Sequence, residues 1–353
     1  MTRVAIVGTG ENPDEPDRTG YAMAYRHADA YAAIDDCDLV AAVDRVPGRV
    51  KSFARQHGLS GDGVFTEHER MLDVIEPDLV SVCTPPSTHA DIVVDCAEAG
   101  VPAVHCEKPM AHTWGASRRM ARVADREGTR LTFNHQRRFA AAVQEAQALI
   151  DEGIVGSVVR VEAAAPTLFD YGTHSVDLVG AFVGERDPEW VFGQVDPRDA
   201  KRYFGVFNAS QALAQWRYSS GVEALIATGE AAGPGLIGAH HRIVGADGVI
   251  ELGVGYPDEE AADRHRYRVD GGDWQTFETD ESIHSDAAIE RALRNVVETL
   301  STDTPSPLGV ENALRATKLV FGTYESARRT ERVTFPLQID DNPLAAMVAD
   351  RRA

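Results

Sequence analysis

Residues 3–10 read RVAIVGTG, an apolar run rich in β-branched side chains that ends in a glycine turn. A polar interruption, ENPDEPDRT at 11–19, separates this run from a helical pattern that opens at Gly20. A second apolar strand at 39–43 ends at Asp44. This order of strand, glycine turn, helix, second strand and terminal acid is typical of a dinucleotide-binding fold.

In such a fold, Gly8 makes the tight turn and Gly10 lets the backbone approach the pyrophosphate. The helix that begins near Gly20 offers N–H groups to the phosphates, and Asp44 accepts hydrogen bonds from ribose hydroxyls. Gly10 and Asp44 are 34 positions apart, and 25 without the interruption, against about 20 expected. We therefore interpret the interruption as a lengthened phosphate loop. Its acidic residues would be unfavourable beside a pyrophosphate and are expected to point outward: Glu11, Asp14, Glu15 and Asp17.

The alternation of strands and helices continues to residue 134 and predicts a doubly wound parallel sheet, a Rossmann domain over residues 1–138. The further strands are expected at 78–83, 101–106 and 131–134, and the helices at 49–57, 67–74, 90–99 and 114–127. The consecutive prolines Pro85 and Pro86 predict an extended loop over 84–89 before the third of these helices.

Lys108 stands directly after the strand VPAVHC, within the sequence EKPM at 107–110. A lysine at the carboxyl end of such a strand points into the crevice where these sheets bind ligands. Partial burial there would lower its pKa and suit it to proton chemistry or to steering a substrate hydroxyl. The alternative is a surface turn that contains a lysine by chance, although the chain has only four lysines.

From residue 156 the pattern becomes rich in strands, which predicts a second, α+β domain over 139–353 with an open, largely antiparallel sheet. The expected strands are 157–163, 190–195, 212–218, 222–229, 241–244 and 249–252, with hairpin turns at 218–221 and 246–248. Helices are expected at 140–152, 282–300 and 310–329. The free face of this sheet would suit a subunit interface.

The most informative stretch of the second half is FDYGTHSVD at 169–177. If a helix starts here, Asp170 and His174 lie on one face and can hydrogen-bond. A carboxylate that orients a histidine and raises its pKa makes the general base that alcohol oxidation needs. The alternative is an N-cap aspartate and a structurally satisfied histidine. Tyr171 is a candidate for lining a sugar site.

Composition excludes several classes of function. The net charge of −20 disfavours nucleic acid and anionic membranes as partners, and no apolar run is long enough for a transmembrane helix. The four cysteines form no CxxC pair, so we expect reduced thiols and a cytoplasmic protein. The acidic surface suggests adaptation to salt, with an acidic protein from a GC-rich genome as the alternative. No metal site is predicted, because His240 and His241 suggest only a strand-edge pair.

Five motifs in this order resemble the glucose–fructose oxidoreductase, inositol dehydrogenase and rhizopine catabolism (Gfo/Idh/MocA) family: GTG, Asp44, CTPPSTH at 83–89, EKP at 107–109 and FNHQRRF at 133–139. The resemblance implies that the loop bearing Thr84, Pro85 and His89 lies beside the nicotinamide. It also implies that Lys108, Asp170 and His174 form the catalytic group, and that Asp177 holds the substrate or His174. The 11–19 interruption is the main departure from the family.

We therefore expect an NAD(P)-dependent oxidoreductase that acts on a sugar or polyol hydroxyl, as a homodimer or homotetramer. NAD is preferred over NADP, since Asp44 would repel a 2′-phosphate while Arg45 and Arg49 partly compensate. The candidate cofactor-binding residues are Gly8, Gly10, Gly20, Asp44, Arg45, Thr84, Pro85, His89 and Glu107, and the candidate substrate-binding residues are Tyr171, Asp177 and Arg138. The alternatives are a redox-neutral enzyme that retains its NAD and a non-catalytic dinucleotide sensor. Arg137 and Arg138 follow a strand of the sheet and could reach the cofactor or the substrate. A solvated surface role for this pair is an equal alternative.

Overall fold

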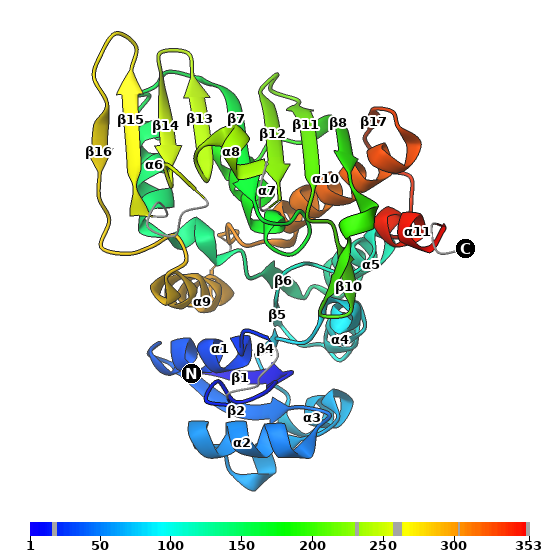
Figure 1. Ribbon diagram of the computed structural model, residues 1–353. Coiled ribbons are helices and arrows are strands. Elements are labelled where there is room, and N and C mark those ends of the chain that lie inside the picture. The colour runs from blue at the N-terminus through cyan, green and yellow to red at the C-terminus, as the bar shows by residue number, and fades with distance from the viewer. Residues whose placement is uncertain (16–19, 230–232, 257–262, 303, 351–353) are drawn as a thin grey trace. The chain divides into compact units, whose positions relative to one another are not determined.

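A computed structural model describes residues 1–15, 20–229, 233–256, 263–302 and 304–350. The chain forms two compact units (Figure 1). Unit 1 comprises Met1–His112, Ala116–Gln136 and Ile289–Ala313, and unit 2 comprises Thr113–Gly115, Arg137–Ala288 and Leu314–Ala353. Among the described residues, no helix is long and apolar enough to cross a membrane.

Unit 1 contains a six-stranded, wholly parallel sheet in the order β3-β2-β1-β4-β5-β6. The strands are β1 (Thr2–Val7), β2 (Cys37–Val43), β3 (Val64–Phe65), β4 (Leu79–Val82), β5 (Ala103–Cys106) and β6 (Arg130–Phe133). Their near-continuous apolar side chains are buried because helices flank the sheet. The strand order reverses between β1 and β4, which is where such sheets bind dinucleotides. The predicted Rossmann architecture is confirmed.

The helices of unit 1 are α1 (Met23–Ala32), α2 (Pro47–His57), α3 (His68–Ile75), α4 (Pro86–Glu98), α5 (Trp114–Glu127) and most of α9 (Asp286–Leu300). The expected extended loop over 84–89 is wrong, because α4 already begins at Pro86. Pro85 caps the helix in an extended conformation, and Pro86 stands in the first turn, where a missing N–H costs nothing.

The segment Ile289–Ala313 completes unit 1 although it follows most of unit 2 in the sequence. The carbonyl oxygen of Leu308 accepts a hydrogen bond from the N–H of Phe133 on the edge strand β6, at 2.9 Å. Arg130 of the same strand donates to the carbonyl of Thr302 at 3.0 Å. This late segment therefore covers the edge of the sheet.

Unit 2 contains a nine-stranded sheet in the order β16-β15-β14-β13-β7-β12-β11-β8-β17. Only β7 and β12 pair in parallel, so the prediction of a largely antiparallel sheet is confirmed. Its strands are β7 (Val158–Ala165), β8 (Pro188–Val195), β11 (Ala212–Tyr218), β12 (Glu223–Thr228), β13 (His241–Gly245), β14 (Gly248–Leu252), β15 (His265–Val269), β16 (Gln275–Phe277) and β17 (Val333–Thr334). A separate hairpin joins β9 (Lys201–Tyr203) and β10 (Val206–Asn208). The sequence did not predict this hairpin or the strands β15, β16 and β17.

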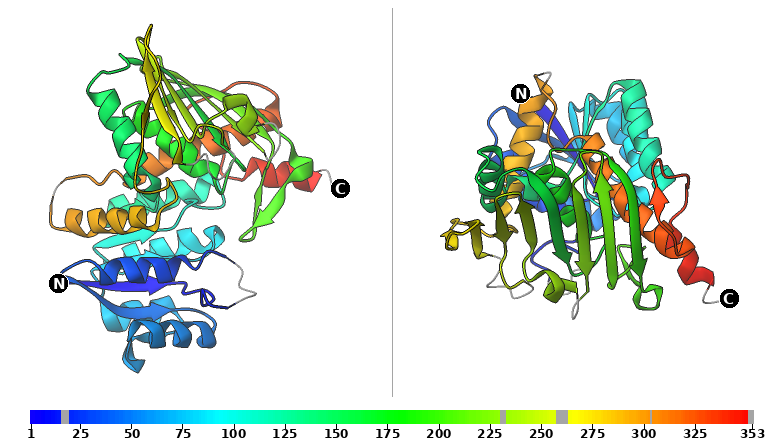
Figure 2. Two further views of the ribbon diagram at one scale, coloured as in Figure 1. Left: turned by 60° about the vertical axis from the view of Figure 1, so that its left-hand side comes forward. Right: turned by 90° about the horizontal axis from the view of Figure 1, so that it is seen from above.

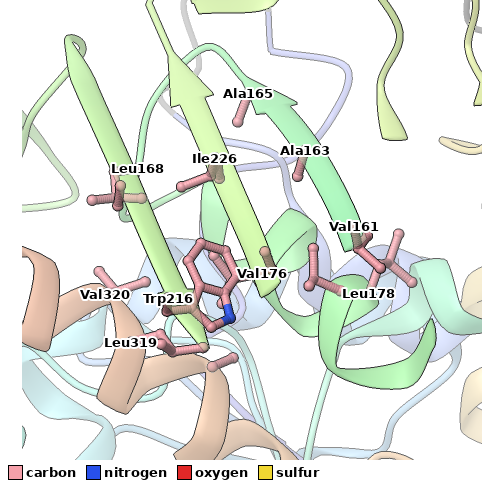
Figure 3. Close-up of a cluster of buried hydrophobic side chains, with 14 of the residues drawn as sticks. Val161, Ala163, Ala165, Leu168, Val176, Leu178, Trp216, Ile226, Leu319 and Val320 are labelled. Carbon is pink, nitrogen blue, oxygen red and sulfur yellow. The ribbon is translucent and has the colours of Figure 1, made fainter. Parts of the chain in front are cut away.

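One face of this sheet packs against α6 (Ala141–Asp151), α7 (Gly172–Phe182) and α10 (Val310–Arg329), as Figure 2 shows. Side chains of β11 alternate in burial, and Trp216 enters the core beside Leu319 and Val320 of α10 (Figure 3). Val176 and Leu178 fix α7 in the same core. The short helices α8 (Gly233–Ile237) and α11 (Pro343–Asp350) complete the unit. The packed core thus fixes α7, whose first turn carries His174.

Candidate active site

The turn after β1 packs closely against the loop after β4. Gly8 has a φ of +92°, and a Cβ atom there would lie 2.5 Å from the side chain of Thr84 and 2.9 Å from its backbone nitrogen. Only glycine fits both this conformation and this approach. Gly8 therefore brings two of the predicted cofactor loops together, in addition to making the turn.

Asp44, at the end of β2, is tied to the same turn. Its carboxylate accepts hydrogen bonds from the Thr9 hydroxyl at 3.1 Å and from the N–H groups of Gly10 and Val46, each at 2.9 Å. A carboxylate has about four acceptor positions, so these three bonds leave room for one further donor such as a ribose hydroxyl. Arg45, next in the sequence, is exposed.

The first part of the interruption lies along α2. Glu11 forms an ion pair with Arg49 at 2.5 Å, and Asn12 donates a hydrogen bond to Ser52 at 3.3 Å. Asp14 and Glu15 are exposed, and Asp17 lies outside the described residues.

Helix α1 begins later than expected, at Met23 rather than Gly20. The residue at its N-cap, Ala22, has no side chain that could cap the first turn, and N–H groups at such a helix start suit a phosphate. The glycine turn, Asp44 and this helix end are therefore a donor and acceptor set that fits a dinucleotide.

His89 joins the loops after β4 and β5. The ring is fully buried, with Nε2 2.7 Å from the carbonyl oxygen of Thr84 and Nδ1 3.1 Å from that of Pro109. Burial lowers the pKa of His89 more than its carbonyl contacts raise it. Because the ring is inaccessible, we assign His89 to positioning the two loops rather than to contact with a cofactor. Pro85, at the start of α4, is exposed.

Glu107 is the centre of a buried polar network at the end of β5. Its carboxylate accepts hydrogen bonds from His27 Nε2 of α1 at 2.9 Å and from Asn134, after β6, at 2.7 Å. Burial alone would raise the pKa of Glu107, but the hydrogen bond and charge of His27, the charge of Lys108 and the Asn134 amide lower it to about 2. These bonds make Glu107 a positioning residue rather than a direct cofactor ligand.

Lys108 follows this fixed carboxylate and is half-buried. Its backbone N–H donates to Oε2 of Glu107 at 3.2 Å. Glu107 thus restrains the backbone of Lys108 at the carboxyl end of β5, as expected for a residue that faces a ligand.

In unit 2, Asp170, Tyr171 and His174 lie at the start of α7. Gly172 is required there, because an added Cβ would lie 2.6 Å from the carbonyl oxygen of Thr167. Asp170 precedes the helix, and His174 lies in its first turn, where it is buried. The predicted helix is present, and it begins at Gly172, two residues after Asp170.

Arg138 and Asp177 are bonded to each other. Nε of Arg138 lies 2.6 Å from one carboxylate oxygen of Asp177, and Nη2 lies 2.8 Å from the other. Glu185 is a second partner of Arg138. Burial alone would lower the pKa of Arg138. The negative charges of Asp177 and Glu185 outweigh this effect and raise the pKa above its ordinary value. Of the two alternatives for Arg138, the solvated surface role is therefore wrong, and this ion pair anchors α7.

His240 and His241 are not at a strand edge, because β13 lies between β14 and β7 and both rings are fully buried. Their Nδ1 atoms are 2.7 Å apart. Nε2 of His240 is 3.0 Å from the hydroxyl of Tyr171, which is also 3.1 Å from Nε2 of His284. No local pattern in the sequence indicates this cluster, because its members come from three separated segments.

Arg137 also belongs to this cluster, so the alternative of a solvated surface role is wrong for it. Its guanidinium lies over the ring of Tyr171, 3.9 Å from the ring centre, and its side chain is buried. The cluster therefore surrounds Tyr171, one of the predicted substrate residues.

The parallel sheet, its glycine turn and the acid at the end of β2 define an NAD-binding Rossmann unit, and Lys108 follows β5 at the carboxyl edge of this sheet, where such units bind ligands. Units of this kind are found in the class of NAD-dependent oxidoreductases. Residues 2–135 match the family model described as "Oxidoreductase family, NAD-binding Rossmann fold". This part of the chain belongs to the Gfo/Idh/MocA oxidoreductase family.

Relatives with named activities support this membership. The chain is 31% identical to D-glucoside 3-dehydrogenase of Escherichia coli over 46% of its own length and 43% of that protein. It is 25% identical to the rhizopine catabolism protein MocA of Rhizobium meliloti, over 74% of this chain and 81% of that one. The structure of myo-inositol 2-dehydrogenase from Lactobacillus plantarum has the same fold, with a TM-score of 0.71 and 20% identity over 95% of this chain and 99% of that one.

Proposed function

We propose that this protein is an NAD-dependent dehydrogenase that oxidises a hydroxyl group of a sugar or polyol. The observation that carries the proposal is the restraint of Lys108 by Glu107 at the carboxyl end of β5. The named activities of the relatives, on a glucoside and on inositols, support the substrate class.

The reaction requires the substrate hydroxyl to lose a proton while its carbon loses a hydride. NAD, when bound, supplies the hydride acceptor. His174, oriented by Asp170, accepts the proton as the general base, and Lys108 donates a hydrogen bond to the same oxygen and stabilises its developing charge. Gly8, Gly10, Gly20 and Asp44 hold the cofactor, with Thr84 and Pro85 beside the nicotinamide.

The test is a set of single substitutions assayed for turnover and for NAD binding. Loss of a general base costs about 10²–10⁴ in rate, so His174→Ala should lower kcat by that order while NAD affinity stays nearly constant. Lys108→Ala should also lower kcat, and Asp170→Asn should have a smaller effect and shift the pH optimum. Lys51→Ala, at an exposed lysine of α2, is the matched control.

Wild-type turnover in His174→Ala would show that another group is the base, with Lys108 the first candidate. Retention of NAD through purification without net formation of NADH would instead indicate a redox-neutral enzyme.

We also propose that the protein forms a homodimer or homotetramer through the face of the unit 2 sheet opposite α7 and α10. The alternation of β11 leaves Leu213 53% exposed, and Phe192 of β8 is 45% exposed. Leu213→Glu should convert the oligomer to monomers in sedimentation measurements. A wild-type monomer at micromolar concentration would contradict the proposal.

A further inference from the structure

Arg137 is a buried charge for which the described part of the chain supplies no counter-ion within an ion-pair distance. Its side chain is 8% exposed, and its Nη1 atom has no hydrogen-bond partner among the described residues. Arg138, the next residue, shows the usual arrangement, since Asp177 and Glu185 neutralise it. A buried cation without an anion costs several kcal/mol, so an arginine in this state is expected where a ligand brings the anion.

The Arg137 guanidinium packs on an aromatic ring that is itself held in place. Its carbon atom lies over the ring of Tyr171, 3.9 Å from the ring centre, and hydrogen bonds to His240 and His284 fix the hydroxyl of Tyr171. An arginine that is restrained on an aromatic face can still donate from the N–H groups at the edge of its guanidinium. These groups bind a planar partner such as a carboxylate through two parallel hydrogen bonds.

The positions of the hydrogen atoms on His240 and His241 can be assigned from the contact of His241 with the backbone carbonyl of Ser175. The carbonyl oxygen of Ser175 can only accept, so Nε2 of His241 carries a hydrogen and donates at 3.0 Å. Nδ1 of neutral His241 must then accept from Nδ1 of His240, and Nε2 of His240 accepts from the Tyr171 hydroxyl. The oxygen of Tyr171 in turn accepts from Nε2 of His284. In this arrangement His240 and His241 are neutral, each with one assigned tautomer, and His284 donates from Nε2.

The electrostatics agree with this assignment. Burial, followed by the charge of Arg137, lowers the pKa of His284 to about 4, and burial likewise lowers the pKa of His241 to about 4. The pKa of His240 is lowered further by burial and by the adjacent His241. At neutral pH the cluster therefore carries the single positive charge of Arg137. One charge matches a monoanion such as a carboxylate better than a phosphate dianion.

We propose that Arg137 binds the carboxylate of a sugar acid, so that the substrates of this enzyme are polyhydroxy carboxylates such as uronates and aldonates. This inference rests on the proposed dehydrogenase function. Arg137 contributes the anion contact, and the chain of Tyr171, His240 and His241 keeps the guanidinium in place.

The experiment compares acid and neutral members of matched pairs, galacturonate with galactose and gluconate with glucitol, in two assays. The first measures kcat/KM of the wild type and of Arg137→Met with NAD. The second measures ligand-induced thermal stabilisation of His174→Ala with NAD, which reports binding without turnover. The wild type should prefer the acids, and Arg137→Met should lose about 10²-fold in kcat/KM on them while the neutral sugars change less than about threefold.

Two further variants test whether the preference for acids depends on Arg137 itself. Arg202→Met removes an exposed arginine that also lies over an aromatic ring, that of Phe207 at 4.4 Å, and should leave the acid preference unchanged. Arg137→Lys keeps the positive charge but loses the planar guanidinium that binds a carboxylate through two hydrogen bonds. This variant should retain a weakened preference for acids, and it provides the test if the methionine variant fails to fold.

Equal use of acids and neutral sugars by the wild type, or an acid preference that Arg137→Met and Arg137→Lys leave intact, would overturn the inference. Oxidation of neutral sugars alone would overturn it while the proposed dehydrogenase function stands. Stabilisation by acids that depends on Arg137, without oxidation of any compound, would support the anion site and contradict the dehydrogenase. Stabilisation by inorganic phosphate stronger than by the acids would also overturn it.

Discussion

The carboxylate of Glu11 lies 2.5 Å from Nη2 of Arg49, so the interruption after the glycine turn engages an arginine of α2. Arg49 is one of the two arginines that could compensate Asp44 in binding the 2′-phosphate of NADP. The ion pair makes this guanidinium less available to a 2′-phosphate, so we expect it to favour NAD. We therefore propose that the interruption after the glycine turn influences the choice of cofactor.

Glu11→Ala should raise the affinity for NADP, by up to about tenfold, because Arg49 then becomes available to the 2′-phosphate. The affinity for NAD should change little. Binding of both cofactors is measured by calorimetry at one ionic strength, with Glu15→Ala, an exposed acid of the same loop, as the control. An unchanged ratio of the two affinities would show that Arg49 does not reach the 2′ position.

Glu107→Gln should destabilise the protein by about 3–5 kcal/mol at pH 7, because His27 and Asn134 lose a buried carboxylate partner. The pKa of Glu107 is about 2 in the folded protein against an ordinary value of 4.5, so its ionised form stabilises the protein fully above about pH 4.5. This contribution, on the order of 3 kcal/mol, is lost as the pH falls towards 2.

The difference in unfolding free energy between the wild type and Glu107→Gln should therefore shrink between pH 4.5 and 2. Urea titrations across this range measure it, with Glu69→Gln on the exposed part of α3 as the control. A difference that does not vary with pH would mean that the charge of Glu107 contributes no stability.

Asp177→Asn should cost about 3–5 kcal/mol of stability, since it leaves Arg138 buried beside a neutral amide. Glu185→Gln removes the other partner of Arg138, which is less buried, and should cost less than about 1 kcal/mol. Denaturant unfolding of both variants measures the contrast. Equal losses would mean that Glu185 holds Arg138 as strongly as Asp177 does.

The net charge of −20 should make stability depend on salt. At roughly 1 M KCl the Debye length falls to about 3 Å, and repulsion among exposed carboxylates is screened. The unfolding free energy should therefore be higher at 1 M than at 0.05 M KCl. Equal stability at both concentrations would remove the case for salt adaptation.

The sequence predicted the buried strands well, because a strand enclosed on both faces leaves a continuous apolar run. The strand Ala212–Tyr218 and the helix Val310–Arg329 match the predicted ranges. The outer strands β15 and β16 were missed, since edge strands carry mixed, partly exposed side chains. The double proline was misinterpreted because Pro86 favours the first turn of a helix as much as a loop.

The candidate site was predictable only where one short segment carries it. Lys108 and the stretch from Asp170 to His174 are contiguous motifs, and the structure places each at the end of an element, as expected. The pairing of Arg138 with Asp177, 39 positions away, and the meeting of His240 with Tyr171, 69 positions away, depend on tertiary packing. No periodicity in the sequence encodes such contacts.

The late segment that covers β6 has a consequence for synthesis of the chain. Arg130 and its partner Thr302 are 172 positions apart, so a ribosome that adds about 5–20 residues per second needs roughly 10–30 s to supply the second after the first. During this interval the backbone of β6 remains an uncovered strand edge, the kind of surface on which nascent chains aggregate. A fragment that ends at residue 138 would keep that edge open permanently.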